Sequence, residues 1–159
     1  MNDVAVVDGD LLDVVDVDAV VNAWNRNIVP WWLLIPRGVS AAIKHQAGLA
    51  PFRELARHGP IPLGRAVTTG AGCLPYKGII HVAAISMAWR ATEASVAAGT
   101  RAALEEARTH RFGSLAFPVL GAGSGGLDRD RALAAMLGAI RDADQGVRVV
   151  VVRYTPEHR

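Results

Sequence analysis

Residues 114–128 read SLAFPVLGAGSGGLD, and this stretch decides the fold class of the chain. It passes from an apolar strand, Ser114–Phe117, into a glycine-rich loop, after which Asp128 is a suitable N-cap for a helix. Four apolar residues of that helix recur on one helical face: Leu133, Met136, Leu137 and Ile140. A strand, a loop and a helix in this order are typical of an α/β fold, in which ligands bind at the carboxyl ends of the strands.

The rest of the chain repeats this alternation of strands and helices. Further strands are predicted at Val4–Val7, Ala19–Asn22, Arg65–Thr69, Gly78–Ala84 and Val147–Val152, and helices at 39–47, 51–58 and 93–110. The first two strands are apolar enough to be buried, and the run VRVVVV at 147–152 needs cover on both faces. We therefore predict a single domain over residues 1–159, a three-layer α/β/α sandwich around a central mixed sheet of about six strands.

Composition narrows the class of protein. Of 159 residues, 51% are hydrophobic and 20% charged, which is typical of a compact globular domain. A net charge of +2 is too small to predict nucleic-acid binding by itself. The lone Cys73 leaves no internal disulfide and no cysteine zinc site, so we expect a cytoplasmic protein. His45, His58 and His110 have no paired ligand spacing, so we expect no metal, and we also expect no cofactor. The N-terminus lacks the pattern of a secretory signal, and the apolar window Ile28–Ile35 is too short to span a membrane.

The glycine-rich loop carries the first functional signal. Glycines at 121, 123, 125 and 126 allow backbone N–H groups to approach a ligand closely, and the N-terminus of the following helix is partly positive. Both features suit a phosphate group. The loop matches neither the Walker pattern nor the dinucleotide-binding fingerprint, so a flexible turn stands as the alternative.

Five segments in order extend this signal to nearly the whole chain. They are GDL at 9–11, VDAVVNAWN at 17–25, GVSAAIKHQAG at 38–48, LPYKGIIHVA at 74–83 and FPVLGAGSGG at 117–126. Together they resemble the successive signature segments of macro domains, the ADP-ribose-binding family. The resemblance runs from Val4 to about Tyr154, and its order and spacing are more specific than any one segment.

The resemblance implies roles for several polar residues. Asp10 stands where the family's aspartate accepts a hydrogen bond from the adenine amino group, and Leu11 where a backbone N–H meets the base. An ordinary turn residue is the alternative for Asp10. Asn25 matches the asparagine that contacts the distal ribose, whereas Asn22 matches one that braces the loop. Tyr154 lies where many relatives place an aromatic ring against adenine, or else is an ordinary aromatic residue at a strand end.

Two backbone segments match the family's cradles for the two phosphates. The first is the end of a turn at Gly38 and Val39, at the start of a helix. The second is the loop Gly121, Ala122, Gly123, Ser124, Gly125 and Gly126. Lys77 and His81 also match common family residues, at strand positions where we expect a structural role.

The chain departs from the family at two positions beside the distal ribose. The family's hydrolytic branch has an aspartate that helps to activate water where this chain has Ser40, and a hydroxyl without a nearby base cannot take a proton as a carboxylate does. Asn25 and Ser40 are nevertheless the candidate catalytic residues. In the phosphate loop, Gly125 replaces the usual Tyr or Phe that closes over the ribose.

A third departure is the stretch RNIVPWWLLIPR at 26–37, which replaces a short glycine-rich turn. We expect Trp31 or Trp32 to supply the aromatic wall that is lost at Gly125. The alternative is that these tryptophans bury against helices or form a homo-oligomer contact.

These expectations leave two main functions open. The chain binds ADP-ribose or a derivative and hydrolyses an ADP-ribose conjugate, as an ADP-ribosyl hydrolase or an O-acetyl-ADP-ribose deacetylase, or it is a non-catalytic ADP-ribose recognition module. Its single domain favours an enzyme, and Ser40 and Gly125 favour a module. The expected partner is ADP-ribose or an ADP-ribosylated substrate, and a nucleic acid only if it is ADP-ribosylated. A single-stranded nucleic-acid binder is a third class, which explains Asp10 and the phosphate loop poorly.

Overall fold

A six-stranded sheet forms the centre of the molecule. The structure, a computed structural model, describes residues 3–25, 39–86, 88, 90–123, 125–143 and 146–155. In spatial order the strands are β1 (Val4–Gly9), β6 (Arg148–Tyr154), β5 (Ser114–Pro118), β2 (Ala19–Asn25), β4 (Gly78–Ile85) and β3 (Ala66–Thr69). Neighbouring strands are parallel except for β3, which runs antiparallel to β4. The mixed six-stranded sheet of the prediction is confirmed.

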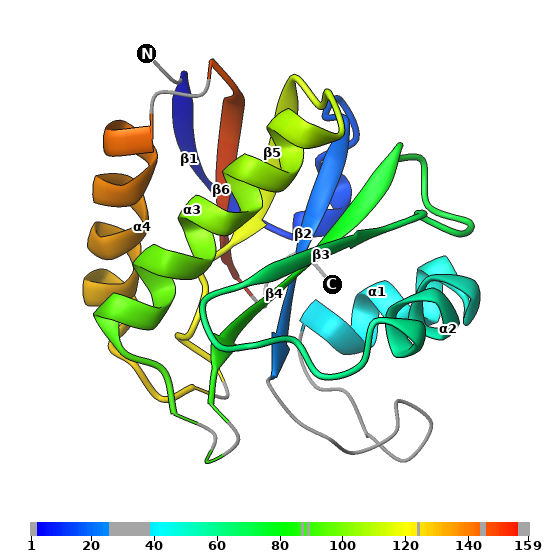
Figure 1. The fold of residues 1–159 in the computed structure, drawn as a ribbon. Helices are drawn as coiled ribbons and strands as arrows, with labels where there is room; N and C mark the ends of the chain where they lie inside the picture. The colour runs from blue at the N-terminus through cyan, green and yellow to red at the C-terminus, as the bar shows by residue number, and fades with distance from the viewer. Residues whose placement is uncertain are drawn as a thin grey trace.

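Helices cover both faces of this sheet (Figure 1). They are α1 (Val39–Ala47), α2 (Ala50–Arg57), α3 (Glu93–Thr109) and α4 (Arg129–Ala143), with a short 3₁₀ helix, η1, at Leu11–Asp13. Helices α3 and α4 lie over one face, and α1 and α2 lie against the other, toward β3 and β4. The predicted three-layer α/β/α sandwich is therefore confirmed. In the part of the chain that the structure describes, no helix has both the length and the apolar character needed to cross a bilayer.

Alternation along the strands divides the core into two halves. On β6, Val149 and Val151 pack in the cluster under α3 and α4, whereas Val150 and Val152 pack in the cluster on the opposite face. All eight residues of β4 are buried. This is the pattern of a parallel sheet covered on two sides, in which both sets of alternate side chains leave water.

Strand β1 contradicts the expectation that Val4–Val7 would be buried. It lies at the edge of the sheet and pairs with β6 alone, and Val6 and Val7 are 37% and 38% exposed. The apolar composition of Val4–Val7 resembles that of a central strand. The order of strands in the sheet, which local composition does not encode, decides the exposure.

Three strands run two or three residues further toward their carboxyl ends than predicted. Strand β1 continues to Gly9, β2 to Asn25 and β6 to Tyr154, and η1 follows β1 after one residue. Because these strands are parallel, their carboxyl ends lie at the same end of the sheet, and the added residues lie there together. Asp10 and Tyr154 are therefore brought to the same end of neighbouring strands.

Helix α3 packs so closely on β4 at Gly99 that no side chain fits there. A Cβ on Gly99 would lie 2.6 Å from Cγ1 of Val82. We expect Gly99→Ala to lower the free energy of unfolding by about 1–3 kcal/mol, because overpacking forces the helix away from the strand.

Urea unfolding measures this effect, with Gly138→Ala on α4 as the matched control. Among the described residues, and apart from the backbone of α4 itself, no atom lies within 4 Å of a Cβ at Gly138, and alanine is the better helix former by up to about 1 kcal/mol. The control should therefore be stabilised or unchanged. Equal destabilisation of both variants would contradict the packing argument.

Candidate functional site

A cleft opens at the carboxyl ends of β1, β5 and β6, with a volume of about 290 Å³. Its lining comes from the carboxyl ends of β5 and β6, from the segments that follow β1 and β5, and from helices α1 and α4. The lining residues are Asp10, Leu11, Ala42, Pro118, Val119, Ala122, Gly123, Arg129, Val152 and Tyr154. The cleft thus lies where parallel α/β sheets bind ligands, and five of these ten residues, namely Asp10, Leu11, Ala122, Gly123 and Tyr154, were predicted from the sequence as ligand-binding.

Asp10 is held in place by the backbone that follows it. It is the N-cap of η1, and its Oδ1 accepts a hydrogen bond from the Leu12 N–H at 3.0 Å. This bond restricts the carboxylate, which lines the cleft, to one orientation. Leu11 is the first residue of η1, where backbone N–H groups lack intrahelical acceptors, and its side chain is buried.

The glycine-rich loop is fixed by its own backbone bonds. Within it, the Gly126 N–H donates to the Gly123 carbonyl at 3.2 Å, and the Leu127 N–H donates to the Gly121 carbonyl at 3.1 Å. Gly121 and Gly126 have φ of 80° and 69°, in the left-handed region that favours glycine. Ala122 and Gly123 line the cleft, whereas Gly121, Gly125 and Gly126 do not. Of the described residues of this loop, Ala122 and Gly123 therefore face a ligand.

Gly125 leaves no space for the aromatic residue that the family usually has there. A Cβ on Gly125 would lie 2.6 Å from the Gly121 carbonyl oxygen and 2.7 Å from Cβ of Ala91. The Gly125 carbonyl also accepts a hydrogen bond from the Ala91 N–H at 3.0 Å. The glycine is thus built into the packing of this loop, and a larger residue would need the loop to move.

Helix α4 begins directly after this loop, as predicted. Asp128 accepts a hydrogen bond on Oδ2 from the Arg131 N–H at 3.1 Å, which confirms its role as the N-cap. The N-terminus of α4 and its first residue, Arg129, thereby come to the wall of the cleft.

Ser40 lies in the first turn of α1, and its side chain is 7% exposed. Its Oγ is buried and has no hydrogen-bond partner among the described residues. The first turn of α1 contains no acidic residue. Ser40 does not line the cleft, although Ala42 of the same helix does. The hydroxyl has free capacity to bond a ligand or a water molecule, but α1 provides no carboxylate to take its proton.

Several predicted site residues lie outside the described part of the chain. These are Trp31, Trp32, Gly38 and Ser124. For Asn25 and Val39 only the backbone is described, as the last residue of β2 and the first of α1. The distal-ribose contact and the tryptophan wall therefore stay predictions.

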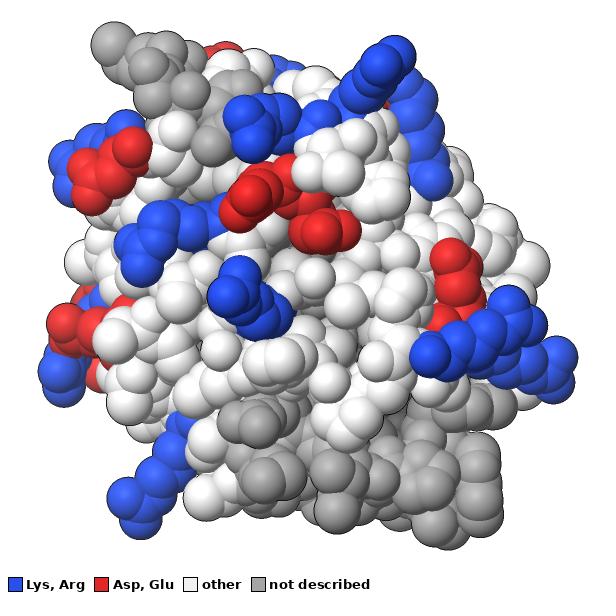
Figure 2. All heavy atoms as spheres, in the orientation of Figure 1, with Lys and Arg blue, Asp and Glu red and all other residues white. Residues whose placement is uncertain are grey.

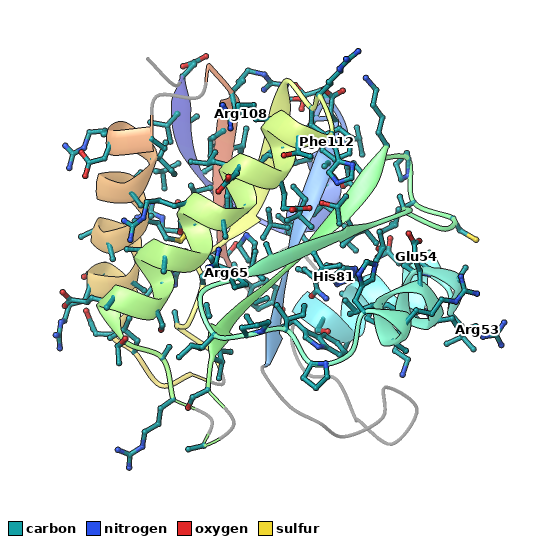
Figure 3. The ribbon with its side chains drawn as sticks, viewed as in Figure 1. Arg53, Glu54, Arg65, His81, Arg108 and Phe112 are labelled. Atoms are coloured by element: carbon teal, nitrogen blue, oxygen red, sulfur yellow. The ribbon has the colours of Figure 1, made fainter. Side chains whose placement is uncertain are left out.

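His81 joins three strands beneath α2, and Figure 3 shows its side chain between the sheet and the two small helices. Its Nδ1 lies 3.0 Å from Asn22 Nδ2, and its Nε2 lies 2.9 Å from Thr69 Oγ1. Since Thr69 donates its proton to the Gly70 carbonyl, Nε2–H must donate to Thr69 and Nδ1 must accept from Asn22. The ring is therefore neutral. Burial, with a smaller effect of the His58 charge, lowers the pKa of His81 to about 3.

The expected structural roles of these polar residues agree with their contacts. Asn22 and His81 are fully buried and bond each other across β2 and β4. Lys77 pairs with Asp18 at 3.0 Å just before β4. The Gly113 N–H and Lys77 together lower the pKa of the Asp18 carboxyl. Asp18, Lys77 and the Gly113 N–H thus join the amino-terminal ends of β2, β4 and β5, away from the cleft, whereas Asn22 and His81 join the middle of β2 and β4.

Sequence reasoning missed one charged residue of the cleft, Arg129. Its Nη2 donates a hydrogen bond to the carbonyl oxygen of Tyr154 at 3.3 Å, and both residues line the cleft. The available signal was its position directly after a phosphate loop and its N-cap, where a helix faces a ligand. Among the described residues, no three His, Cys, Asp or Glu side chains are grouped so that they could hold a metal ion.

Comparison with known proteins decides the family. The macro domain family model matches residues 21–136. An uncharacterized protein of Aquifex aeolicus is 39% identical over 140 residues, which are 87% of this chain and 81% of that protein. This chain belongs to the macro domain family. A macro domain-containing protein of Methanosarcina mazei is 31% identical over 143 residues, 87% of this macro domain and 72% of the relative.

Solved structures agree with this assignment. A variant of the Oceanobacillus iheyensis macrodomain, solved with ADPR, has a TM-score of 0.81 and 25% identity, over 98% of this chain and 87% of the other. The same macrodomain solved with ADP has a TM-score of 0.72 and 27% identity, over 88% and 77% of the two chains.

One relative by sequence is much longer than this chain. It is an uncharacterized protein of Mycobacterium tuberculosis, 36% identical over 126 residues, and the match covers 34% of its length.

Proposed function

We propose that this macro domain binds ADP-ribose or a derivative of it in the cleft described above. One observation carries the proposal: Asp10, Tyr154 and the middle of the glycine-rich loop line the same cleft. In this arrangement the Asp10 carboxylate accepts a hydrogen bond from the adenine amino group, and the Tyr154 ring covers the base. The backbone at Ala122 and Gly123 receives the diphosphate. The Oceanobacillus macrodomains solved with ADPR and with ADP support this choice of ligand.

Hydrolysis of an ADP-ribose conjugate is a second proposal for the same site. The observation that favours it is the buried Ser40 hydroxyl without a partner among the described residues. This hydroxyl is free to hold a water molecule or a ribose hydroxyl, and Asn25 is proposed to hold the distal ribose. Water would add across the bond between ADP-ribose and its attached group, or across the ester of O-acetyl-ADP-ribose. If no water is activated, the domain is a recognition module.

The face shown in Figure 2 favours a small nucleotide over a nucleic acid as the ligand. On the face shown in Figure 2, lysine and arginine side chains lie among aspartate and glutamate side chains instead of forming one basic stripe. A nucleic-acid groove needs a continuous row of positive charges along the backbone. We therefore propose that nucleic acid is bound only where it carries ADP-ribose. We also propose, from the lone Cys73, that the protein acts in the cytoplasm.

Calorimetric titration with ADP-ribose tests binding, with guanosine diphosphate as the control ligand. Saturable binding of ADP-ribose, and much weaker binding of the control, is the expected result. Turnover is then measured on mono-ADP-ribosylated protein, ADP-ribosylated DNA and O-acetyl-ADP-ribose, with Ser40→Ala as the comparison. Release of product that Ser40→Ala slows would support hydrolysis, and binding without release would assign a recognition module. Absence of ADP-ribose binding at millimolar concentration would refute the proposal.

A further inference from the structure

We propose that Arg129 is a specificity-determining residue that pairs with the phosphate next to the adenosine ribose of the ligand. The inference rests on the proposed function, and it assigns a role to a residue that the phosphate loop and the adenine contact leave unexplained. Through Arg129 the cleft selects adenosine phosphates over adenosine itself.

The position of Arg129 in the fold supports this role. Arg129 is the first residue of α4, and the loop that precedes it contributes Ala122 and Gly123 to the cleft. Its guanidinium reaches the end of β6, where Nη2 donates to the Tyr154 carbonyl at 3.3 Å. Arg129 is therefore linked through the chain to the proposed phosphate end and through a hydrogen bond to the proposed adenine end. A ligand that occupies both ends passes this side chain with its ribose and first phosphate.

The charges around the cleft also support this role for Arg129. Among the described residues that line the cleft, Asp10 and Arg129 carry the charges, and Arg129 is the positive one. A neighbouring hollow that shares Asp10 with the cleft is also lined by Asp13, and by Asp8, whose charge Arg153 balances. A diphosphate that enters beside these carboxylates is repelled unless a cation faces it. Arg129 supplies that cation on the wall of the cleft.

The Arg129 guanidinium forms no ion pair within the described part of the structure and keeps most of its hydrogen-bond donors for a ligand. Arg131 pairs with Glu93 at 2.6 Å, and Arg153 pairs with Asp8 at 2.8 Å. In contrast, the contact of Arg129 that the structure shows is with a neutral carbonyl oxygen. A guanidinium has five N–H donors in a planar fork, so one bond to the backbone orients it and leaves donors for two phosphate oxygens.

The experiment compares four ligands on three variants. Adenosine, AMP, ADP and ADP-ribose are titrated into the unmodified protein, Arg129→Gln, Arg129→Lys and the control Arg101→Gln. Arg101 is an exposed residue of α3 that does not line the cleft, and its replacement makes the same change of net charge. Calorimetry serves for the phosphates, and ligand-observed NMR at millimolar concentration serves for adenosine.

We expect Arg129→Gln to weaken the binding of AMP, ADP and ADP-ribose about tenfold, which corresponds to the loss of one charge-assisted hydrogen bond. The affinity for adenosine should be unchanged. Arg129→Lys should lose less affinity for these phosphates, because lysine keeps the positive charge but lacks the planar set of guanidinium donors. Added salt should weaken ADP binding to the unmodified protein more than to Arg129→Gln. Arg101→Gln should match the unmodified protein.

Two results would overturn the inference while the proposed function stands. In the first, Arg129→Gln binds all four ligands as the unmodified protein does. In the second, it loses affinity equally for adenosine and for the phosphates, which indicates that the guanidinium stacks on the base or merely supports Tyr154. If the unmodified protein binds none of the four ligands, the proposed function itself is wrong.

Discussion

Asp10→Asn is expected to weaken ADP binding about ten- to a hundredfold and to remove the preference for ADP over inosine diphosphate. The carboxylate accepts a charge-assisted hydrogen bond from the adenine amino group, worth about 1.5–3 kcal/mol. Inosine diphosphate carries a carbonyl oxygen in place of that amino group, and a carboxylate repels it. An asparagine amide can donate to this oxygen, so the variant should lose affinity for ADP and gain affinity for inosine diphosphate.

The substitution is suitable because it spares the local structure. The Asp10 Oδ1 that accepts from the Leu12 N–H at 3.0 Å has an equivalent oxygen in asparagine, which is also a good N-cap. The matched control is Asp13→Asn, in the same 3₁₀ helix but outside the lining of the cleft. Calorimetry with both nucleotides gives the ratio of affinities. A ratio that Asp10→Asn leaves unchanged would show that the carboxylate does not face the base.

The second large effect is on stability at low pH, through His81. The ring is fully buried, and its pKa in the folded protein is lowered to about 3 from an ordinary value of 6.5. Below pH 6.5 the unfolded chain therefore binds a proton on this histidine that the folded protein does not. Acidification therefore stabilises the unfolded state relative to the folded state. As a result, the free energy of unfolding falls as the pH drops from 6.5 toward 3. The expected loss approaches about 1.4 kcal/mol per pH unit from this one group.

Urea unfolding at pH 7, 6, 5 and 4.5 measures this dependence. His45→Gln, on an exposed residue of α1, is the matched control. His81→Gln should reduce the slope by one proton. If that variant does not fold, NMR of the His81 ring in the unmodified protein gives the same information. A ring signal that titrates between pH 7 and 5 in the folded protein would contradict the expectation.

Periodicity in the sequence predicted the layers and the sheet because both follow from local rules. The spacing of apolar residues predicts which face of an element is buried, as in the strand at 147–152 and in the helix that contains Met136 and Ile140. The exposure of β1 could not be predicted in this way, because it depends on which strands become neighbours. Its valines look like those of β6, yet β1 pairs on one side alone.

The site was partly predictable for a related reason. Asp10 and the loop around Gly123 belong to motifs whose order along the chain is specific. In the sequence, Arg129 is an exposed arginine at a helix start, like many others. Its place in the cleft depends on a contact with the end of β6, where its guanidinium bonds the carbonyl of Tyr154, 25 residues later. Composition around Ser40 gave no sign that its hydroxyl would be buried without a partner among the described residues.

The central claim is that ADP-ribose occupies the cleft at the ends of β1, β5 and β6. Titration of ¹⁵N-labelled protein with ADP-ribose, followed by backbone amide NMR shifts, tests it most directly. We expect saturable shifts at Leu11, Ala122 and Gly123, which line the cleft, and none at Gly70, which lies beyond β3 next to Glu54. No shift at millimolar ADP-ribose, or shifts that cluster around Gly70 and spare the cleft, would contradict the claim.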